Sequence, residues 1–323
     1  MNVQLLLINK NSILFKCMVL IGETKRYNCN TMTDRYAVIG NPISHSKSPL
    51  IHTQFACQTG QDLIYEAILA PLNGFRDTVL AFRDDGGRGM NVTVPFKFEA
   101  FQLATQLTVR AQAAQAVNTL KFDGTEIIGD NTDGAGLIAD IERNLDFKLQ
   151  DKRVLLMGAG GAAYGVALPL LNAGAIVTVV NRTEDKAHQL AAVFSTHGPI
   201  QGSSYIALAG SQFDCVINAT SSSLADSLPP LPRGENASLL PSPNSSFSIE
   251  EKTKCGGIFA PNALAYDMMY GKETPFLIFA KEQGATRLAD GLGMLVEQAA
   301  ESFFLWRNIR PDTASVIAKL RLI

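Results

Sequence analysis

The stretch Arg153–Lys186, RVLLMGAGGAAYGVALPLLNAGAIVTVVNRTEDK, decides the fold of this chain. It opens with the apolar run Val154–Met157, which is long enough for one buried strand, and a glycine-rich turn at 158–161 follows directly. A helical pattern of small residues then runs to Ala173, and a β-branched run at Ile176–Val180 comes next. This order of strand, glycine turn, helix and strand predicts the first half of a dinucleotide-binding βαβ unit.

The small residues of the turn have distinct physical roles. Gly158 permits the tight turn, Gly160 lets the backbone approach a pyrophosphate without a β-carbon in the way, and Ala163 lets the helix pack closely on the strands. Free N–H groups at the helix start, with the positive end of the helix dipole, would face the phosphates. The predicted cofactor-binding residues of this turn are Gly158, Ala159, Gly160, Gly161 and Ala162.

The residues after the second strand indicate which dinucleotide is bound. An NAD site usually places Asp or Glu there for the ribose 2′-hydroxyl, whereas an NADP site needs positive charge for the 2′-phosphate. Arg182 and Lys186 supply a guanidinium and an ammonium, and Asn181 and Thr183 add amide and hydroxyl groups. Glu184 is the exception, because it could bond a ribose hydroxyl or simply favour a helix N-terminus. The pattern favours NADP and leaves NAD open.

Length and composition limit the class of protein. With 323 residues the chain exceeds the usual single-domain size, so two domains are expected. A formal net charge of −2 without a basic cluster argues against a nucleic-acid binder. No apolar run reaches the ~20 residues of a membrane helix. Five scattered cysteines without metal-ligand spacing indicate reduced thiols in a cytoplasmic protein that holds no metal.

The first 33 residues form the segment that fits this scheme least well. They are apolar in bursts broken by Lys10, Asn11 and Lys16, and they lack both a basic n-region and a convincing cleavage site. We expect residues 1–33 to be an N-terminal extension that is dispensable for function. Translation from Met32 would lead directly into the first strand and is an alternative hypothesis.

Residues 34–132 alternate predicted strands and helices, which implies a mostly parallel, doubly wound sheet. A strand at 36–39 ends in a Gly-Asn-Pro turn, and a helix to about Thr59 should begin at Pro49 with Ser48 as its N-cap. The remaining predicted elements are strands at 63–69 and 90–94, a helix at 72–83, and a hairpin of 116–120 with 126–129. We expect this segment to be an α/β domain of its own, placed before the nucleotide-binding domain.

Residues 133–293 are the expected NADP-binding domain, separated from the first domain by a cleft and joined to it by a hinge at 130–135. A helix at 135–144 should link the two, and strands are predicted at 213–217 and 264–268. The segment 225–257, rich in Pro, Ser and Asn and without periodicity, reads as a long loop. Thr274-Pro275 should begin a helix through Ala280, and helices are expected at 294–306 and after Pro311.

Two charged residues are candidates for the proton transfer that accompanies hydride transfer. Lys97 follows a predicted strand and a Pro turn, so it should lie at the carboxyl end of a strand, where α/β sheets build their sites. Asp133 lies in the glycine-rich turn between the two predicted domains. A Lys–Asp pair across a cleft would hold the lysine while it gives or accepts a proton. Taken alone, each could be a solvated surface charge.

Hydroxyl groups beside a helix start form a candidate carboxylate receptor. Ser46 and Ser48 have this position, although Ser48 alone would be interpreted as an N-cap. Asn91 and Thr93, on one face of a strand, could add donors. His45 is expected to brace the loop, because no acidic partner that would orient it as a base can be identified.

Taken together, these motifs resemble the shikimate dehydrogenase family. The resemblance runs from Tyr36 to about Ile317 and rests on GNPISHSKSP (40–49), NVTVPFK (91–97), AVNTL (116–120), GDNTDG (129–134), GAGGAA (158–163), NRT (181–183), NATS (218–221), YDMMY (266–270) and DGLGMLVEQA (290–299). It implies NADPH-dependent reduction of 3-dehydroshikimate to shikimate, without a metal, on the pathway to chorismate and the aromatic amino acids.

The resemblance also implies residue roles. Lys97 would be the acid/base with Asp133 as its partner. The substrate would be bound by Ser46, Ser48, Thr93, Asn118, Asp133, Tyr270 and Gln298. The cofactor would be bound by the glycine turn and by Asn181, Arg182, Thr183 and Lys186. It would also be lined by Thr220, Ser221, Met268, Gly291 and Met294. Residues 34–132 would be the substrate-binding and catalytic domain, and the C-terminal helices, 294–323, would pack back on this domain and complete it.

Two alternatives stay open beside this interpretation. Glu184 stands where relatives with dual specificity carry an acid, so the chain could be a quinate/shikimate dehydrogenase with mixed NAD and NADP use. A nucleotide-binding regulator without catalysis would share the fold, although the joint presence of Lys97 and Asp133 argues against it. The sequence is compatible with a monomer or a homodimer.

Overall fold

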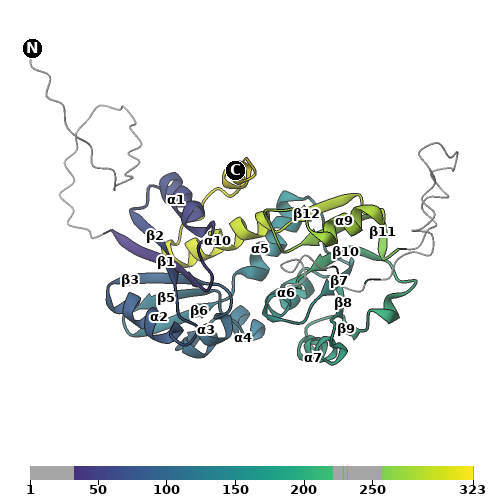
Figure 1. The fold of residues 1–323 in the computed structure, drawn as a ribbon, viewed down its shortest axis with the longest axis horizontal. Helices are drawn as coiled ribbons and strands as arrows, with labels where there is room; N and C mark the ends of the chain where they lie inside the picture. The colour runs from purple at the N-terminus through teal and green to yellow at the C-terminus, as the bar shows by residue number, and fades with distance from the viewer. Residues whose placement is uncertain (1–32, 221–227, 229–230, 232–256, 323) are drawn as a thin grey trace, which may run out of the picture. The chain divides into compact units, whose positions relative to one another are not determined.

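The computed structural model describes residues 33–220, 228, 231 and 257–322. The expected extension, 1–33, lies outside the described residues except for Thr33, and the expected loop, 225–257, does so except for positions 228, 231 and 257. The described chain has an α/β fold with two six-stranded, mostly parallel sheets, as the sequence predicts (Figure 1).

The first sheet has the strand order β2-β1-β3-β5-β6-β4. Its strands are β1 Asp34–Gly40, β2 Leu63–Leu69, β3 Gly87–Val92, β4 Gln106–Leu107, β5 Thr119–Asp123 and β6 Glu126–Asp130. β1 pairs in parallel with β2 and β3, whereas β5 pairs antiparallel with β3 and β6. The sheet is therefore mostly parallel, as expected, and its antiparallel part includes the predicted hairpin, which reverses the chain at Gly124, whose φ is +59°.

The second sheet is parallel throughout and has the order β12-β11-β10-β7-β8-β9. Its strands are β7 Arg153–Met157, β8 Ile176–Val180, β9 Ile200–Ser203, β10 Phe213–Asn218, β11 Phe259–Asp267 and β12 Arg287–Asp290. Read from β9, this is the strand order of a dinucleotide-binding fold, with β8 and β9 on one side of β7 and β10, β11 and β12 on the other. The point where the strand order reverses lies between β7 and β10.

Helices connect the strands, and four of the predicted starts need correction. The helices expected from 72 and from 294 begin at Phe75 and at Leu292. The helices are α1 Ser48–Thr59, α2 Phe75–Asp84, α3 Lys97–Leu103, α4 Val109–Ala114, α5 Asp133–Ala139, α6 Gly161–Asn172, α7 Glu184–Phe194, α9 Pro275–Glu282, α10 Leu292–Arg307 and α11 Ala314–Leu320. The N-cap of α1 is Lys47 and Ser48 is its first helical residue, so the predicted Ser48 cap is wrong. The linking helix begins at Asp133 rather than 135 and continues as a π-helical turn, Asp140–Asn144.

Glycines bring α5 unusually close to two other helices. A β-carbon on Gly134 would lie 2.5 Å from the Gly165 carbonyl oxygen of α6, and one on Gly136 would lie 2.6 Å from the Gln298 backbone nitrogen of α10. Real β-carbons essentially never approach backbone atoms so closely. The sequence around Asp133 therefore needs glycine for packing, and the packing fixes the helix that carries Asp133.

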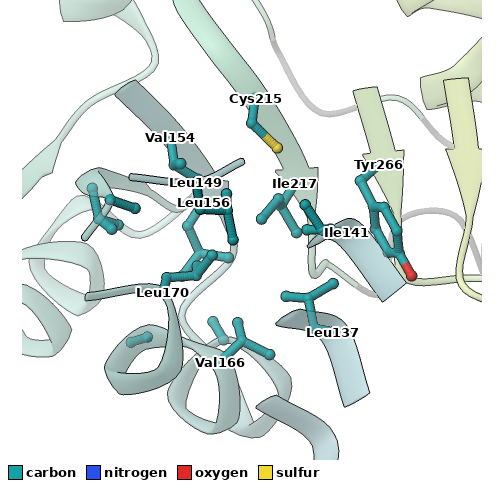
Figure 2. Packing of buried hydrophobic residues seen from close by; sticks show 14 of the residues in the cluster. Leu137, Ile141, Leu149, Val154, Leu156, Val166, Leu170, Cys215, Ile217 and Tyr266 are labelled. Atoms are coloured by element: carbon teal, nitrogen blue, oxygen red, sulfur yellow. The ribbon is translucent and has the colours of Figure 1, made fainter. Parts of the chain in front are cut away.

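The hydrophobic core of the second sheet is continuous with α5. Figure 2 shows Leu137 and Ile141 beside Val166 of α6 and Ile217 of β10, all of them buried. A separate cluster joins Ile51 and Phe55 of α1 to α10 and α11. None of the helices in the described part of the chain is long and apolar enough to cross a membrane.

Candidate active site

The ammonium of Lys97 and the carboxylate of Asp133 form an ion pair, with 2.6 Å between Nζ and Oδ2. Lys97 begins α3 just beyond the carboxyl end of β3, and Asp133 begins α5 just beyond β6. The Asp133 side chain is 9% exposed and the Lys97 side chain 24% exposed, so the lysine remains accessible to a small molecule while its partner is nearly covered. The two sequence candidates are thus brought together.

Asn118 holds the other oxygen of Asp133. Its amide nitrogen donates to Asp133 Oδ1 at 2.8 Å and to the hydroxyl of Thr132 at 2.9 Å, and Gln298 Oε1 lies 3.3 Å from the same nitrogen. The Asn118 side-chain oxygen accepts from the backbone N–H of Thr132 at 2.9 Å. Because Asn118 precedes β5, Thr132 precedes α5 and Gln298 lies on α10, three distant segments converge on this carboxylate.

A second set of buried polar side chains, centred on Asn91, packs beneath Asn118 and Thr132 and helps to hold them in place. Asn91 donates to Ser302 Oγ at 2.9 Å and to Thr119 Oγ1 at 3.1 Å, and it accepts from the Tyr65 phenol at 2.7 Å. Asn91 is buried and its amide is committed to these partners, so we assign it a supporting role instead of the substrate contact considered from the sequence. Burial also raises the pKa of Tyr65 well above its ordinary value, which keeps this phenol neutral.

The hydroxyl residues lie in two loops that are joined to each other. The backbone N–H of Asn41 donates to the Val94 carbonyl at 3.0 Å, and that of Thr93 donates to the Ile39 carbonyl at 2.9 Å. The Ser48 backbone N–H donates to Ser46 Oγ at 3.3 Å. The loops after β1 and β3 are therefore neighbours, as expected for adjacent parallel strands.

Two further residues singled out in the sequence can be placed. Tyr270 is half-buried against the cluster of α1, α10 and α11, and burial raises the pKa of its phenol. His45 is exposed, and within the described segments its ring has no hydrogen-bond partner that would support the expected bracing of the loop.

The glycine turn after β7 has the features that a pyrophosphate requires. Gly158 has a φ of +108°, and a β-carbon there would lie 3.1 Å from the Ala219 carbonyl oxygen. A β-carbon on Gly160 would meet no atom within 4 Å, so the turn faces open space at the start of α6. The N-terminus of a twelve-residue helix beside that space fits a phosphate group.

The positions predicted for the remainder of the cofactor line the same edge of the second sheet. Arg182, Thr183 and Lys186 are exposed after β8, and the Asn181 amide donates to the Thr183 carbonyl at 2.9 Å. Glu184 Oε1 lies 3.3 Å from His188 Nε2. After β10, β11 and β12 come Thr220, Met268, Gly291 and the buried Met294, while Ser221 lies outside the described residues.

Gly291 and Met268 are packed closely at this edge. A β-carbon on Gly291 would lie 2.2 Å from the Met268 carbonyl oxygen. The Gly291 N–H also donates to the Met269 carbonyl at 2.8 Å. The loop after β11 and the start of α10 are therefore held together by backbone contacts.

Sequence reasoning did not single out Thr132, Thr119 or Ser302 as parts of the site. Thr119 lies inside the AVNTL motif and Thr132 inside the GDNTDG motif, so their positions in these motifs were the available signal. Ser302 lies one helical turn after Gln298 on α10, and that spacing could have placed it on the same face. Phe98, also missed, lies beside Gly161: its ring carbon would be 3.4 Å from a β-carbon there.

Comparisons with known proteins agree on one family. Residues 38–120 match the family described as shikimate dehydrogenase substrate binding domain, residues 140–225 match shikimate / quinate 5-dehydrogenase, and residues 291–321 match the shikimate 5′-dehydrogenase C-terminal domain.

Individual relatives match over almost their whole length. The NADP(+) shikimate dehydrogenase of Aromatoleum aromaticum is 60% identical over 89% of this chain and 97% of its own. That of Nitrosospira multiformis is 58% identical over 90% and 98%. Among solved structures, shikimate 5-dehydrogenase from Thermus thermophilus, in complex with NADP(H) and shikimate, has a TM-score of 0.74 at 30% identity and covers 89% of this chain and 98% of its own.

Proposed function

Because the chain belongs to the shikimate dehydrogenase family, we propose that it catalyses the reversible, NADPH-dependent reduction of 3-dehydroshikimate to shikimate. The contact between Lys97 and Asp133 carries the proposal, since a lysine amine held by a carboxylate at the carboxyl end of the first sheet could supply the proton. The reaction would belong to the route to chorismate and the aromatic amino acids and would take place in the cytoplasm.

The chain's own residues would manage the proton. The bound cofactor supplies the hydride to the carbonyl carbon. Lys97 Nζ would give a proton to the carbonyl oxygen as that oxygen becomes a hydroxyl, and it would take the proton back in the oxidation direction. Asp133 would hold the ammonium in place through Oδ2, while Asn118 fixes Oδ1 at 2.8 Å. Asp133 would therefore position Lys97 and also accept from a ring hydroxyl.

The substrate is an anion with several hydroxyl groups, and the polar set suits both features. Ser46, Ser48 and Thr93 would bind the carboxylate from the two joined loops, with the neutral phenol of Tyr270 close by. Asn118 and Gln298 would bond the ring hydroxyls. Gln298 is suited to this because its side-chain oxygen already faces Asn118 and Thr132.

NADP fits the second sheet in three places. The open space at Gly160 and the start of α6 would take the pyrophosphate. Arg182 and Lys186 would pair with the 2′-phosphate, with Asn181 and Thr183 beside them. Thr220, Met268, Gly291 and Met294 would line the nicotinamide half. We propose residues 34–132, completed by 294–323, as the substrate-binding domain and residues 133–293 as the NADP-binding domain.

The test is absorbance of the reduced nicotinamide while shikimate is added, with NADP and NAD in parallel and quinate as a second substrate. Rapid reduction of NADP with shikimate alone is the expected result. Comparable rates with NAD or quinate would favour the mixed quinate/shikimate enzyme, a candidate supported by the acidic Glu184 next to the ribose position. An absence of reduction with every pair would contradict both and leave a nucleotide-binding regulator.

A further inference from the structure

A small cavity on the first sheet lies apart from all the residues proposed for catalysis and cofactor binding. Its volume is about 240 Å³, and its walls are formed by Asp34, Tyr36, Arg88, Lys121, Phe122, Trp306 and Arg307. Three cationic side chains and one carboxylate line it, so positive charge is in excess. The volume is below the ~300 Å³ at which sites for drug-sized molecules begin, and any occupant must be small.

The strand register explains why these side chains share one cavity. Lys121 of β5 is paired with Gly89 of β3, and paired residues project to the same face of a sheet. A β-carbon on Gly89 would lie 2.5 Å from Trp306 Nε1, so that face is the one that Trp306 covers. The register between β1 and β3 passes from Gly87 to Gly89, which leaves Arg88 in a bulge at the strand end.

The hydrogen-bond donors around the cavity outnumber the acceptors. Asp34 is the one carboxylate, and it is shared: Oδ1 accepts from Arg88 Nε at 3.1 Å and Oδ2 accepts from Arg307 Nη1. Arg307 Nε donates to Gln61 at 2.7 Å. Within residues 33–220, 228, 231 and 257–322, Lys121 Nζ and both terminal nitrogens of Arg88 have no partner. A guanidinium has five N–H donors and an ammonium three, so most of this capacity is unused.

We propose that this cavity binds a small oxyanion, a carboxylate or a phosphate group, between Lys121 and Arg88 and beside the ring of Trp306. Such groups offer the acceptors that the two cations lack, and charge-assisted bonds of this kind are the strong ones. Asp34 opposes the anion, but Arg307 and Arg88 already compensate its charge, which leaves Lys121 as the cation without a counterion. The inference does not depend on the proposed function, because none of its residues belongs to that site.

The chain offers its own reporter for the test. Trp306 is its only tryptophan, so intrinsic fluorescence of the full-length protein reports on this cavity. Inorganic phosphate and benzoate are titrated separately at constant ionic strength, into the parent and into Lys121→Gln. Lys148→Gln, at an exposed lysine outside the cavity, is the matched control. Lys121→Arg, which keeps the charge, and circular dichroism of each variant separate lost binding from lost folding.

The expected result is a saturable change with one or both anions that is about tenfold weaker in Lys121→Gln, unchanged in Lys148→Gln and largely retained in Lys121→Arg. A response to phosphate alone assigns a phosphate ligand, and a response to benzoate alone assigns a carboxylate with a ring against Trp306. Ser48→Ala changes the proposed carboxylate receptor and not the cavity, so anion binding that Trp306 reports should stay intact in this variant. Absence of saturable binding, indifference to Lys121→Gln, or loss in Ser48→Ala would overturn the proposal.

Discussion

The backbones of Gly136 and Gln298 are in direct contact, so close that a β-carbon on Gly136 would lie 2.6 Å from the Gln298 nitrogen. Gly136 lies one helical turn after the residues that begin α5, and Gln298 lies at the middle of α10. The side chain of the same Gln298 has its oxygen 3.3 Å from Asn118 Nδ2. The spacing of two helices thus sets the position of a polar group at the candidate active site.

Gly136→Ala should destabilise the protein and weaken shikimate binding. The added methyl meets helix backbone, which can yield only by moving α10, and such overpacking costs about 1–3 kcal/mol. Alanine is the better helix former by about 1 kcal/mol, so the expected net loss in unfolding free energy is on the order of 1 kcal/mol. Urea denaturation and the KM for shikimate measure the two effects. Ala135→Ser, at the partly exposed neighbour, is the control; unchanged stability and KM in Gly136→Ala would contradict this account.

The nucleotide-binding half was predictable because its signals are local and agree with one another. The apolar run 154–157, the glycine turn and the β-branched run 176–180 correspond to β7, the turn and β8. The edge strands β9 and β12 were not predicted, since IQGS and RLAD have neither length nor alternation to mark them. Pairing with β8 and β11 creates these strands, and that pairing is a tertiary effect.

The residues of the polar site could be predicted from the sequence better than the hydrogen bonds between them. Lys97 and Asp133 could be proposed from strand ends and the family resemblance, and the structure brings them together. The hydrogen bond between Asn118 and Gln298 joins residues 180 positions apart, which no local pattern can indicate. The burial of Asn91 was missed for the same reason, because its partners Tyr65 and Ser302 come from a distant strand and a distant helix.

Lys97→Ala should abolish most turnover and leave shikimate binding nearly intact. General acid–base catalysis contributes about 100-fold to 10,000-fold, and the ammonium contacts Asp133 rather than the set proposed for the carboxylate. We expect kcat to fall by at least about 100-fold and shikimate affinity to stay within about tenfold. Stopped-flow kinetics and calorimetric binding measure these, with Lys148→Ala as the control. Near-normal turnover in Lys97→Ala would remove the acid/base assignment.

Asp133→Asn should reduce turnover through the position of Lys97. An asparagine keeps the oxygen that accepts from Asn118 if its amide nitrogen faces Lys97, and two donors would then oppose each other. The lysine would leave the site that the 2.6 Å contact defines. We expect kcat to fall more than tenfold with the fold intact by circular dichroism. If Asp133→Asn and Lys97→Ala each left the effect of the other unchanged in a double-mutant cycle, the two residues would be acting independently.

His52 should make the protein less stable as the pH falls. It is 1% exposed, stacks on Tyr65 at 4.2 Å, and neither ring nitrogen has a hydrogen-bond partner among the described residues. Burial lowers its pKa from 6.5 to about 3. The unfolded chain therefore takes up the proton first, so stability is complete above pH 6.5 and falls below it. At pH 5 the loss is about 2 kcal/mol.

The variant His52→Phe isolates this effect. Phenylalanine keeps a ring in the aromatic cluster and cannot be protonated. The unfolding free energy of the variant should therefore fall less between pH 7 and pH 5 than that of the parent. At pH 7 the variant should be at least as stable as the parent, because it removes two buried nitrogens without partners. Urea denaturation at several pH values measures both. Equal pH slopes in the two proteins would show that folding does not lower the pKa of His52.

Arg182→Ala should weaken NADP far more than NAD. Arg182 is exposed directly after β8, where only NADP presents a phosphate. A charge-assisted contact of this kind is worth about 1.5–3 kcal/mol and less when solvent screens it, so we expect the KM for NADP to rise about tenfold. NAD serves as the control within the same variant, and its KM should change less than about twofold. Glu184→Gln tests the opposing charge, since losing the acid should lower the KM for NADP. If Arg182→Ala raised both KM values equally, Arg182 would bind a part that the two cofactors share, and the 2′-phosphate assignment would be wrong.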